Sequence, residues 1–196
     1  MNTMLVLLGA STGGPAAVKT FIDALPKQRL PACFVLANHI TEEFVPSLRE
    51  MLDEHPFIKA EIIDGEKLIK PGYLYIAPVT NKLEFKDSNI RLSEDSWTKP
   101  YAPNISDMFT ASLKVKNMEK LAIIFSGMDN DGANSADIMT DNGVEIWCQS
   151  IESCVQSSMP ESIIKTGQVI YKDDPEGLAR QLSDLLEVVY PVDQYA

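Results

Sequence analysis

Four polar side chains that could take part in catalysis each follow an apolar run of the chain. They are Ser11 after residues 5–8, His39 after residues 33–37, and Asp129 and Asp131 after residues 121–125. A serine hydroxyl becomes a nucleophile when a base removes its proton, and a neutral imidazole can do so near pH 7. The imidazole in turn needs a carboxylate that holds its tautomer and stabilises its charged form. These residue types therefore allow a serine hydrolase whose carboxylate comes from one of the two aspartates.

Ser11 lies in the segment Gly9-Ala10-Ser11-Thr12-Gly13-Gly14, which an expected helix over residues 16–25 follows. The glycines let another molecule approach the backbone closely, and the N–H groups at the start of a helix favour an anion or an oxyanion. The segment suits a serine nucleophile or a bound phosphate, and a plain glycine-rich turn is the structural alternative. A nucleotide-binding domain is disfavoured, because the P-loop lysine and the Gly-x-Gly-x-x-Gly spacing are both missing.

Apolar strands and amphipathic helices alternate along the chain. Strands are expected over residues 5–8, 33–37, 60–63, 121–125, 144–148 and 169–171, and helices over residues 16–25, 42–54, 105–116, 159–165 and 175–189, with one more ending at residue 141. This alternation predicts an α/β fold with three α/β/α layers around a mainly parallel sheet. Residues 73–92 instead form short runs split by turn residues, which predicts an antiparallel hairpin insertion. Function collects at the carboxyl ends of parallel strands, where the four polar side chains are expected.

The expected helix over residues 42–54 has one apolar face. Its members are Phe44, Leu48, Met51 and Leu52. His55 follows this helix and precedes Pro56, where a protonated side chain would interact favourably with the helix dipole. We therefore assign His55 a structural role. His39, which follows an apolar strand directly, is the candidate base, and a buried structural histidine is the alternative for it.

Composition limits the classes of protein to which this chain can belong. Its 196 residues suit one domain over residues 1–196, and 45% of them are hydrophobic. The net charge of −11 disfavours nucleic acids and anionic membrane surfaces as partners, and no apolar run is long enough for a membrane-spanning helix. Cys33, Cys148 and Cys154 lack metal-ligand spacing, and we expect reduced thiols in a cytoplasmic protein, with the first two in the core.

The segment Asp129-Asn130-Asp131-Gly132 has the composition of a turn or of part of a calcium loop. It lacks the glutamate that closes an EF-hand loop, which disfavours calcium. We therefore expect neither a metal nor a cofactor.

Several of these segments together resemble the catalytic domain of the CheB chemotaxis methylesterases. The principal motifs are Gly9-Ala10-Ser11-Thr12-Gly13-Gly14, Asn38-His39 and Gly127-Met128-Asp129-Asn130-Asp131-Gly132, and the weaker landmarks, in order, are Asp64-Gly65-Glu66, Pro71-Gly72, Tyr75-Ile76-Ala77-Pro78, Ser153-Cys154-Val155 and Met159-Pro160. The resemblance extends from Leu5 to about Leu186 and implies a Rossmann-like sheet. It also implies hydrolysis of glutamate methyl esters on chemoreceptors and deamidation of receptor glutamines.

The resemblance also implies a role for each motif residue. Ser11 would be the nucleophile, His39 the base and Asp131 the orienting carboxylate. Asp129 falls where the family usually has glycine, which excludes it from the triad. Thr12, Gly13 and the backbone N–H of Met128 would stabilise the oxyanion or contact the substrate.

Several positions around the expected site differ from the family's usual residues. Asn38-His39-Ile40-Thr41 stands for Gln-His-Met-Pro, Ala77-Pro78-Val79 for Ala-Pro-Gly, Ala102-Pro103-Asn104-Ile105-Ser106 for Arg-Pro-Ser-x-Asp, and Ser157-Ser158 for an aromatic residue and glycine. The family's usual form also has an amino-terminal receiver domain, and we expect none within these 196 residues. We therefore expect no control by phosphorylation within this chain, and a separate response-regulator protein is a candidate partner.

Two functions remain open at this stage. The first is a serine esterase acting on methylated glutamates of a receptor or a receptor-like helical protein, which the complete set of expected catalytic residues favours. The second is a catalytically weak or inactive module of the same fold that binds a signalling partner. The residues around the expected site that differ from the family's usual ones favour this second function. The distances among Ser11, His39 and Asp131 are the observation that bears most directly on this choice.

Overall fold

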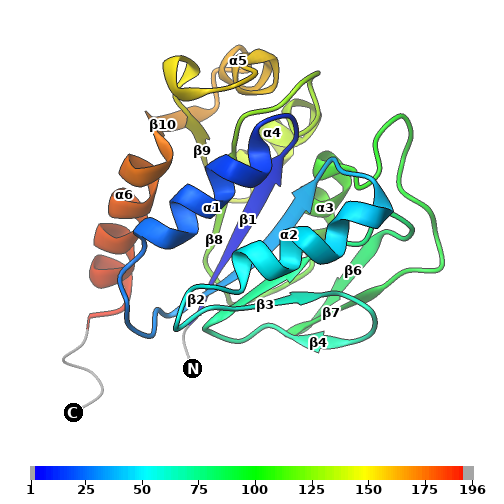
Figure 1. The fold of residues 1–196 in the computed structure, drawn as a ribbon, viewed down its shortest axis with the longest axis horizontal. Coiled ribbons are helices and arrows are strands. Elements are labelled where there is room, and N and C mark those ends of the chain that lie inside the picture. Colours follow the sequence, from blue (N-terminus) through cyan, green and yellow to red (C-terminus); the bar gives the residue numbers. More distant parts are fainter. Residues whose placement is uncertain (1–2, 192–196) are drawn as a thin grey trace.

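The computed structural model describes residues 3–191, and its centre is a seven-stranded sheet in which all neighbouring strands run parallel. The strand order is β10-β9-β8-β1-β2-β5-β3 (Figure 1). The bounds are β1 Met4–Ala10, β2 Ala32–Asn38, β3 Lys59–Ile62, β5 Tyr73–Ile76, β8 Lys120–Ile124, β9 Glu145–Gln149 and β10 Val169–Asp173. The expected α/β fold with a mainly parallel sheet is confirmed.

Helices cover both faces of this sheet and complete three layers (Figure 1). One face carries α1 Gly14–Ala24, α2 Val45–Leu52 and α6 Pro175–Val189, and the other carries α3 Ile105–Ser112, α4 Ala136–Asp141 and α5 Ser158–Ile164. The second face also carries a small antiparallel sheet, with strands β4 Lys67–Leu68, β6 Leu83–Lys86 and β7 Asn89–Leu92. No helix in residues 3–191 is both long and apolar enough to cross a membrane.

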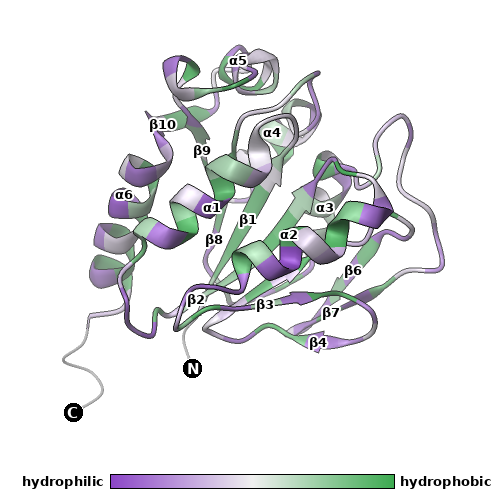
Figure 2. Cartoon of the chain, viewed as in Figure 1, coloured by the Kyte–Doolittle hydropathy of each residue, from purple (hydrophilic) through white to green (hydrophobic). Residues whose placement is uncertain are grey.

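Strand β1 lies at the centre of the sheet and is buried along its whole length. Val6 and Leu8 pack in one hydrophobic cluster, and Leu5 and Leu7 pack in the other. This is the alternation of side chains expected of a strand with helices on both faces. Figure 2 shows the same distribution, with hydrophobic colour on the central strands and hydrophilic colour on the outer surfaces of the helices. Both clusters therefore depend on β1, and the position of Ser11 directly after it is well determined.

The antiparallel insertion is smaller than the sequence pattern predicts. Residues 83–92 form the hairpin of β6 and β7, but Tyr73–Ile76 is β5 and pairs parallel with β2 and β3 in the main sheet. Leu74, Tyr75 and Ile76 are buried because both faces of the strand are covered. The assignment of residues 73–77 to the hairpin is therefore wrong.

The expected helix over residues 42–54 begins later than predicted. Residues 42–44 form a 3₁₀ turn, and the α-helix starts at Val45 with Pro46 in its first turn. Proline has no N–H to donate to the preceding turn and is therefore favoured at a helix start. Leu48 and Leu52 are buried as expected, whereas Phe44 precedes the helix and is exposed, which corrects the assignment of Phe44 to its inner face.

The prediction that Cys33 and Cys148 are free thiols in the core is confirmed. Cys33 and Cys148 are free and buried, and burial raises the pKa of each thiol to about 12. Both therefore stay protonated and pack as small apolar side chains.

Phe21 on α1 provides a test of the packing between helix and sheet. Its ring is fully buried and packs edge-on against Phe34 of β2 and Phe125 after β8. We expect Phe21→Ala to lower the free energy of unfolding by about 3–5 kcal/mol. Urea denaturation measures this loss, with the exposed Val188→Ala on α6 as the control. A Phe21→Ala loss as small as that of the control would contradict the packing described.

Candidate active site

The loops after three neighbouring strands bring Ser11, His39 and Asp131 to one edge of the sheet. Ala10 of β1 pairs with Asn38 of β2, and the His39 N–H donates to the Ala10 carbonyl at 2.9 Å. On the other side of β1, the Ser11 N–H donates to the Ser126 carbonyl at 3.1 Å. The chain passes from β1 to β2 on one side and later adds β8 on the other, so this edge is the topological switch point at which α/β sheets bind ligands.

Asp131 holds the imidazole of His39. The distance between His39 Nε2 and Asp131 Oδ2 is 2.9 Å. The same carboxylate accepts hydrogen bonds from the backbone N–H groups of Ile105 at 2.7 Å, Ser106 at 3.0 Å and Gly132 at 2.8 Å. Two of these donors belong to the first turn of α3, whose dipole also favours a negative charge.

Asp131 stays ionised although it is almost completely buried, with 2% of its surface exposed. Burial raises the pKa of this carboxyl, but the hydrogen bonds from His39, Ile105 and Ser106 outweigh burial and hold the pKa below its ordinary value. The carboxylate can therefore fix the tautomer of His39 with the proton on Nε2, which leaves Nδ1 as the atom able to accept a proton.

Ser11 is buried except for 8% of its surface, and its hydroxyl makes no hydrogen bond within residues 3–191. His39 Nδ1 likewise has no partner among these residues. The Ser11 hydroxyl and the free imidazole nitrogen thus lie on adjacent strand ends without the direct hydrogen bond of a closed triad. A separation of this kind is common in the absence of substrate.

Backbone N–H groups without partners surround Ser11. Within the described chain, those of Thr12, Gly13 and Met128 make no hydrogen bond. Thr12 and Gly13 directly precede α1, and Gly13 takes a positive φ of 76° that favours glycine. N–H groups of this kind can stabilise an oxyanion.

Two residues after β8 fix the loop that lies against Ser11. The fully buried Ser126 hydroxyl donates to the Thr12 carbonyl at 2.7 Å and accepts from the Gln156 N–H at 3.0 Å. A Cβ at Gly127 would lie 2.8 Å from the Ser11 Cβ and 2.5 Å from the Met159 Cε, so only glycine fits there without displacement. The motif Ser126-Gly127 therefore determines how closely Met128 approaches the serine.

Asp129, the other candidate carboxylate, is exposed, has a positive φ of 71°, and makes no side-chain hydrogen bond in the part of the chain that the structure describes. Asp131 alone of the pair contacts His39.

The altered positions around the site have new partners in this chain. The Ser106 hydroxyl accepts from the Gly132 N–H at 2.9 Å, and the Ser157 hydroxyl donates to Glu161 at 2.8 Å. Asn38 is buried, and its Oδ1 is the one buried side-chain polar atom of residues 3–191 without a partner. Its Nδ2 donates to the His39 carbonyl at 3.2 Å. Ser106 and Ser157 thus keep polar connections at these positions, whereas Asn38 Oδ1 has none within residues 3–191, and Val79 and Ala102 carry no polar side chain.

Sequence analysis missed Ser126 and Tyr101. The Tyr101 ring is stacked on the His39 ring, with 5.0 Å between the centroids. Serine and tyrosine in polar loops give no periodic signal, and only the tertiary structure brings these two to the site.

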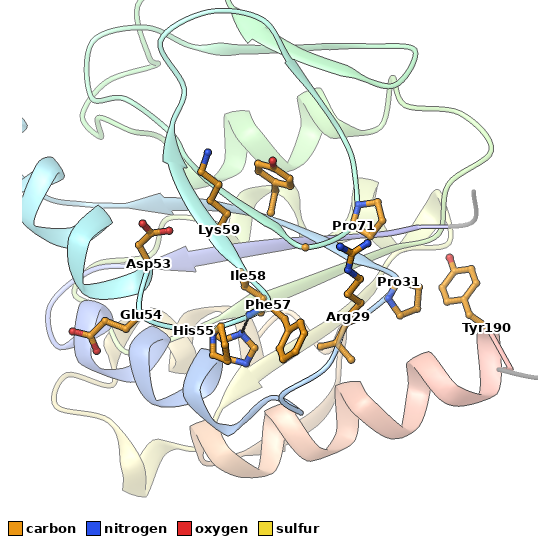
Figure 3. Close-up of a pocket in the computed structure, with 14 residues that line it drawn as sticks. Arg29, Pro31, Asp53, Glu54, His55, Phe57, Ile58, Lys59, Pro71 and Tyr190 are labelled. Atoms are coloured by element: carbon orange, nitrogen blue, oxygen red, sulfur yellow. Dashed lines mark hydrogen bonds between the residues drawn. The ribbon is translucent and has the colours of Figure 1, made fainter. Parts of the chain in front are cut away.

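A cavity of about 950 Å³ lies at the opposite edge of the sheet, by the amino ends of β2, β3 and β5 (Figure 3). His55 lines it and is buried, and burial together with the charge of Lys27 lowers its pKa. The interpretation of His55 as a helix-end cation is therefore wrong. Its ring instead accepts from the Phe57 N–H at 3.3 Å. The acidic residues of the cavity, Asp53 and Glu54, are paired with Arg49 and Lys19.

The pKa of Asp131 has a consequence for stability in acid. Because the folded pKa lies below the unfolded value, Asp131 stabilises the fold above about pH 4, and this contribution is lost as the pH falls through the folded pKa. Asp131→Asn should therefore be less stable than the wild type at pH 7, and the difference should shrink as the pH falls below about 4 and through the folded pKa. Urea unfolding at each pH measures it, with exposed Asp184→Asn as the control. A difference that does not change with pH would contradict this account.

The family model described as CheB methylesterase matches residues 6–182. A protein-glutamate methylesterase/protein-glutamine glutaminase 1 of Myxococcus xanthus is 34% identical over 173 residues, which cover 85% of this chain and 49% of that protein. The protein of the same name from Saccharophagus degradans is 32% identical over 165 residues, covering 83% of this chain and 45% of that protein. The chain thus spans about half the length of these curated relatives.

A solved structure agrees with the sequence comparison. The crystal structure of the Thermotoga maritima CheB methylesterase catalytic domain matches with a TM-score of 0.85 and 25% identity, covering 94% of this chain and all of that one. On the family match over residues 6–182 and this agreement in fold, the chain belongs to the CheB methylesterase family.

Proposed function

We propose that this chain is a protein-glutamate methylesterase that uses Ser11, His39 and Asp131 as its catalytic triad. The observation that carries the proposal is the partly buried hydrogen bond of 2.9 Å between His39 Nε2 and Asp131 Oδ2, on the strand end beside Ser11. The names of the curated relatives state methylesterase and glutaminase activity. We extend both activities to this chain, because an ester and a side-chain amide pass through similar tetrahedral intermediates.

In the proposed mechanism, Ser11 Oγ attacks the ester carbonyl of a methylated glutamate while His39 Nδ1 accepts the hydroxyl proton. The N–H groups of Thr12, Gly13 and Met128 stabilise the oxyanion that forms, and Asp131 stabilises the imidazolium. The intermediate collapses, His39 returns its proton, and methanol leaves the acyl-enzyme. A water molecule activated by His39 then releases the glutamate and restores Ser11.

The proposed substrate is a methylated receptor or a receptor-like helical protein in the cytoplasm. Two exposed apolar side chains flank the Ser11 turn: Met128, 48% exposed, follows Gly127, and Val155, 75% exposed, packs against Gly13. The chain's net charge of −11 repels an acidic partner at long range, so docking depends on such local apolar contacts. A separate response-regulator protein is a second proposed partner and would control access to this edge.

The catalytic roles are tested by methanol release from a methylated receptor. Ser11→Ala and His39→Ala should each lower kcat/KM by about 10³-fold or more, and Asp131→Asn by about 10²-fold or more. Asp129→Asn is the matched control and should stay within about threefold of the wild type, because Asp129 does not contact His39. Equal loss in Asp129→Asn and Asp131→Asn would contradict the assigned carboxylate. Receptor binding without methanol release by the wild type would favour the inactive binding module.

A separate experiment tests docking of the substrate on the exposed apolar side chains beside Ser11, Met128 and Val155. Val155→Ser should raise KM by about five- to tenfold and leave kcat unchanged, since burial of the valine side chain contributes about 1–1.5 kcal/mol. Val188→Ser is the matched control, because Val188 is 79% exposed on α6 and lies outside this edge. An unchanged KM for Val155→Ser would mean that this part of the rim does not contact the substrate.

A further inference from the structure

The ring of Tyr101 covers one face of the His39 imidazole. The two centroids are 5.0 Å apart, and the planes are inclined by only 6°. His39 Nε2 points at the Asp131 carboxylate, in the plane of the imidazole. The carboxylate therefore restrains the position of Nε2, and the stacked ring restrains the tilt of the imidazole plane.

Tyr101 is itself held in place. Its hydroxyl donates to Asn130 Oδ1 at 2.9 Å, and Asn130 directly precedes Asp131. The loop that carries Tyr101 is attached on both sides: the buried Trp97 donates to the Pro78 carbonyl at 2.9 Å, and Asn104 Nδ2 donates to the Thr98 carbonyl at 2.8 Å. These hydrogen bonds hold the Tyr101 ring in its position beside His39.

The hydroxyl of Tyr101 keeps its proton. Burial and the negative charges of Asp129 and Asp131 raise its pKa above the ordinary value. It therefore remains a hydrogen-bond donor to Asn130 and adds no charge next to the imidazole.

A single hydrogen bond to Nε2 leaves the imidazole free to rotate about the line that joins Nε2 to Oδ2. Such rotation would change the direction of Nδ1, and the stacked ring of Tyr101 opposes it. An aromatic face also attracts a cation, which favours the imidazolium that forms as the serine loses its proton. Both effects act on the chemical step.

We propose that Tyr101 is a positioning residue that fixes the plane of the His39 ring, by stacking on it while bonded to Asn130. The proposal rests on the methylesterase function proposed above. It assigns the Tyr101 ring the main effect and the Tyr101 hydroxyl a smaller one.

Ring-proton NMR tests the stacking without any activity measurement, since the chain has only two histidines. A stacked tyrosine moves the ring-proton resonances of His39 upfield. Tyr101→Ala should abolish this shift and Tyr101→Phe should keep it, while the buried His55 at the other edge of the sheet stays unchanged as an internal reference. A His39 resonance that is unchanged in Tyr101→Ala would overturn the proposal.

Kinetics test the consequence for catalysis. Tyr101→Ala should lower kcat for methanol release about tenfold with KM within about twofold of the wild type, and Tyr101→Phe should recover kcat to within about threefold. Tyr73→Ala is the matched control, because it removes a tyrosine that stacks on Tyr75 away from the site.

The outcomes separate this proposal from the proposed function. An effect of Tyr101→Ala confined to KM, or a Tyr101→Phe as slow as Tyr101→Ala, would overturn the positioning role while Ser11-dependent release left the proposed function intact. A wild type that releases no methanol from a methylated receptor would overturn both.

Discussion

A carboxylate removed from water needs hydrogen-bond donors, and Asp131 obtains four of them from three segments of the chain: the His39 ring, the first turn of α3 and its own loop. This compensation holds its pKa below the ordinary value in a site where burial alone would raise it. Because Asp131 follows β8 and His39 follows β2, the same interaction links the two strands that flank β1. The orientation of the imidazole and the start of α3 therefore depend on one buried charge.

The Ser11 side of the site depends on close packing of backbone instead. Gly127 leaves no room for a side chain against Ser11, and the Ser126 hydroxyl connects the Ser11 turn to the loop before α5. These contacts bring to the serine three N–H groups that make no hydrogen bond within residues 3–191, and the Ser11 hydroxyl makes none there either. In the proposed mechanism, Asp131 orients His39 as the base, and the glycine-rich turns around Ser11 bind the ester group of the substrate.

Long apolar runs made most of the fold predictable from the sequence. The strands β1, β2 and β8 are continuous runs buried on both faces, and their periodicity and length suffice to identify them. Tyr73–Ile76 is short, rich in aromatics and bounded by turn residues, so its pairing with β2 and β3 could be recognised only from the tertiary structure. Phe44 continues the apolar periodicity of the helix, but Pro46 occupies the first turn of α2 and leaves Phe44 before the helix and exposed. Tyr101 and Ser126 lie in loops and contribute through tertiary contacts, which no periodic pattern encodes.

The central claim is that Ser11 is a nucleophile activated by His39. The most direct measurement is peptide mapping by mass spectrometry after reaction with a fluorophosphonate, which phosphonylates an activated serine and releases fluoride. The account predicts one adduct on Ser11, formed much more slowly in His39→Ala than in the wild type. An adduct on another serine, or labelling of Ser11 at the same rate without His39, would contradict it.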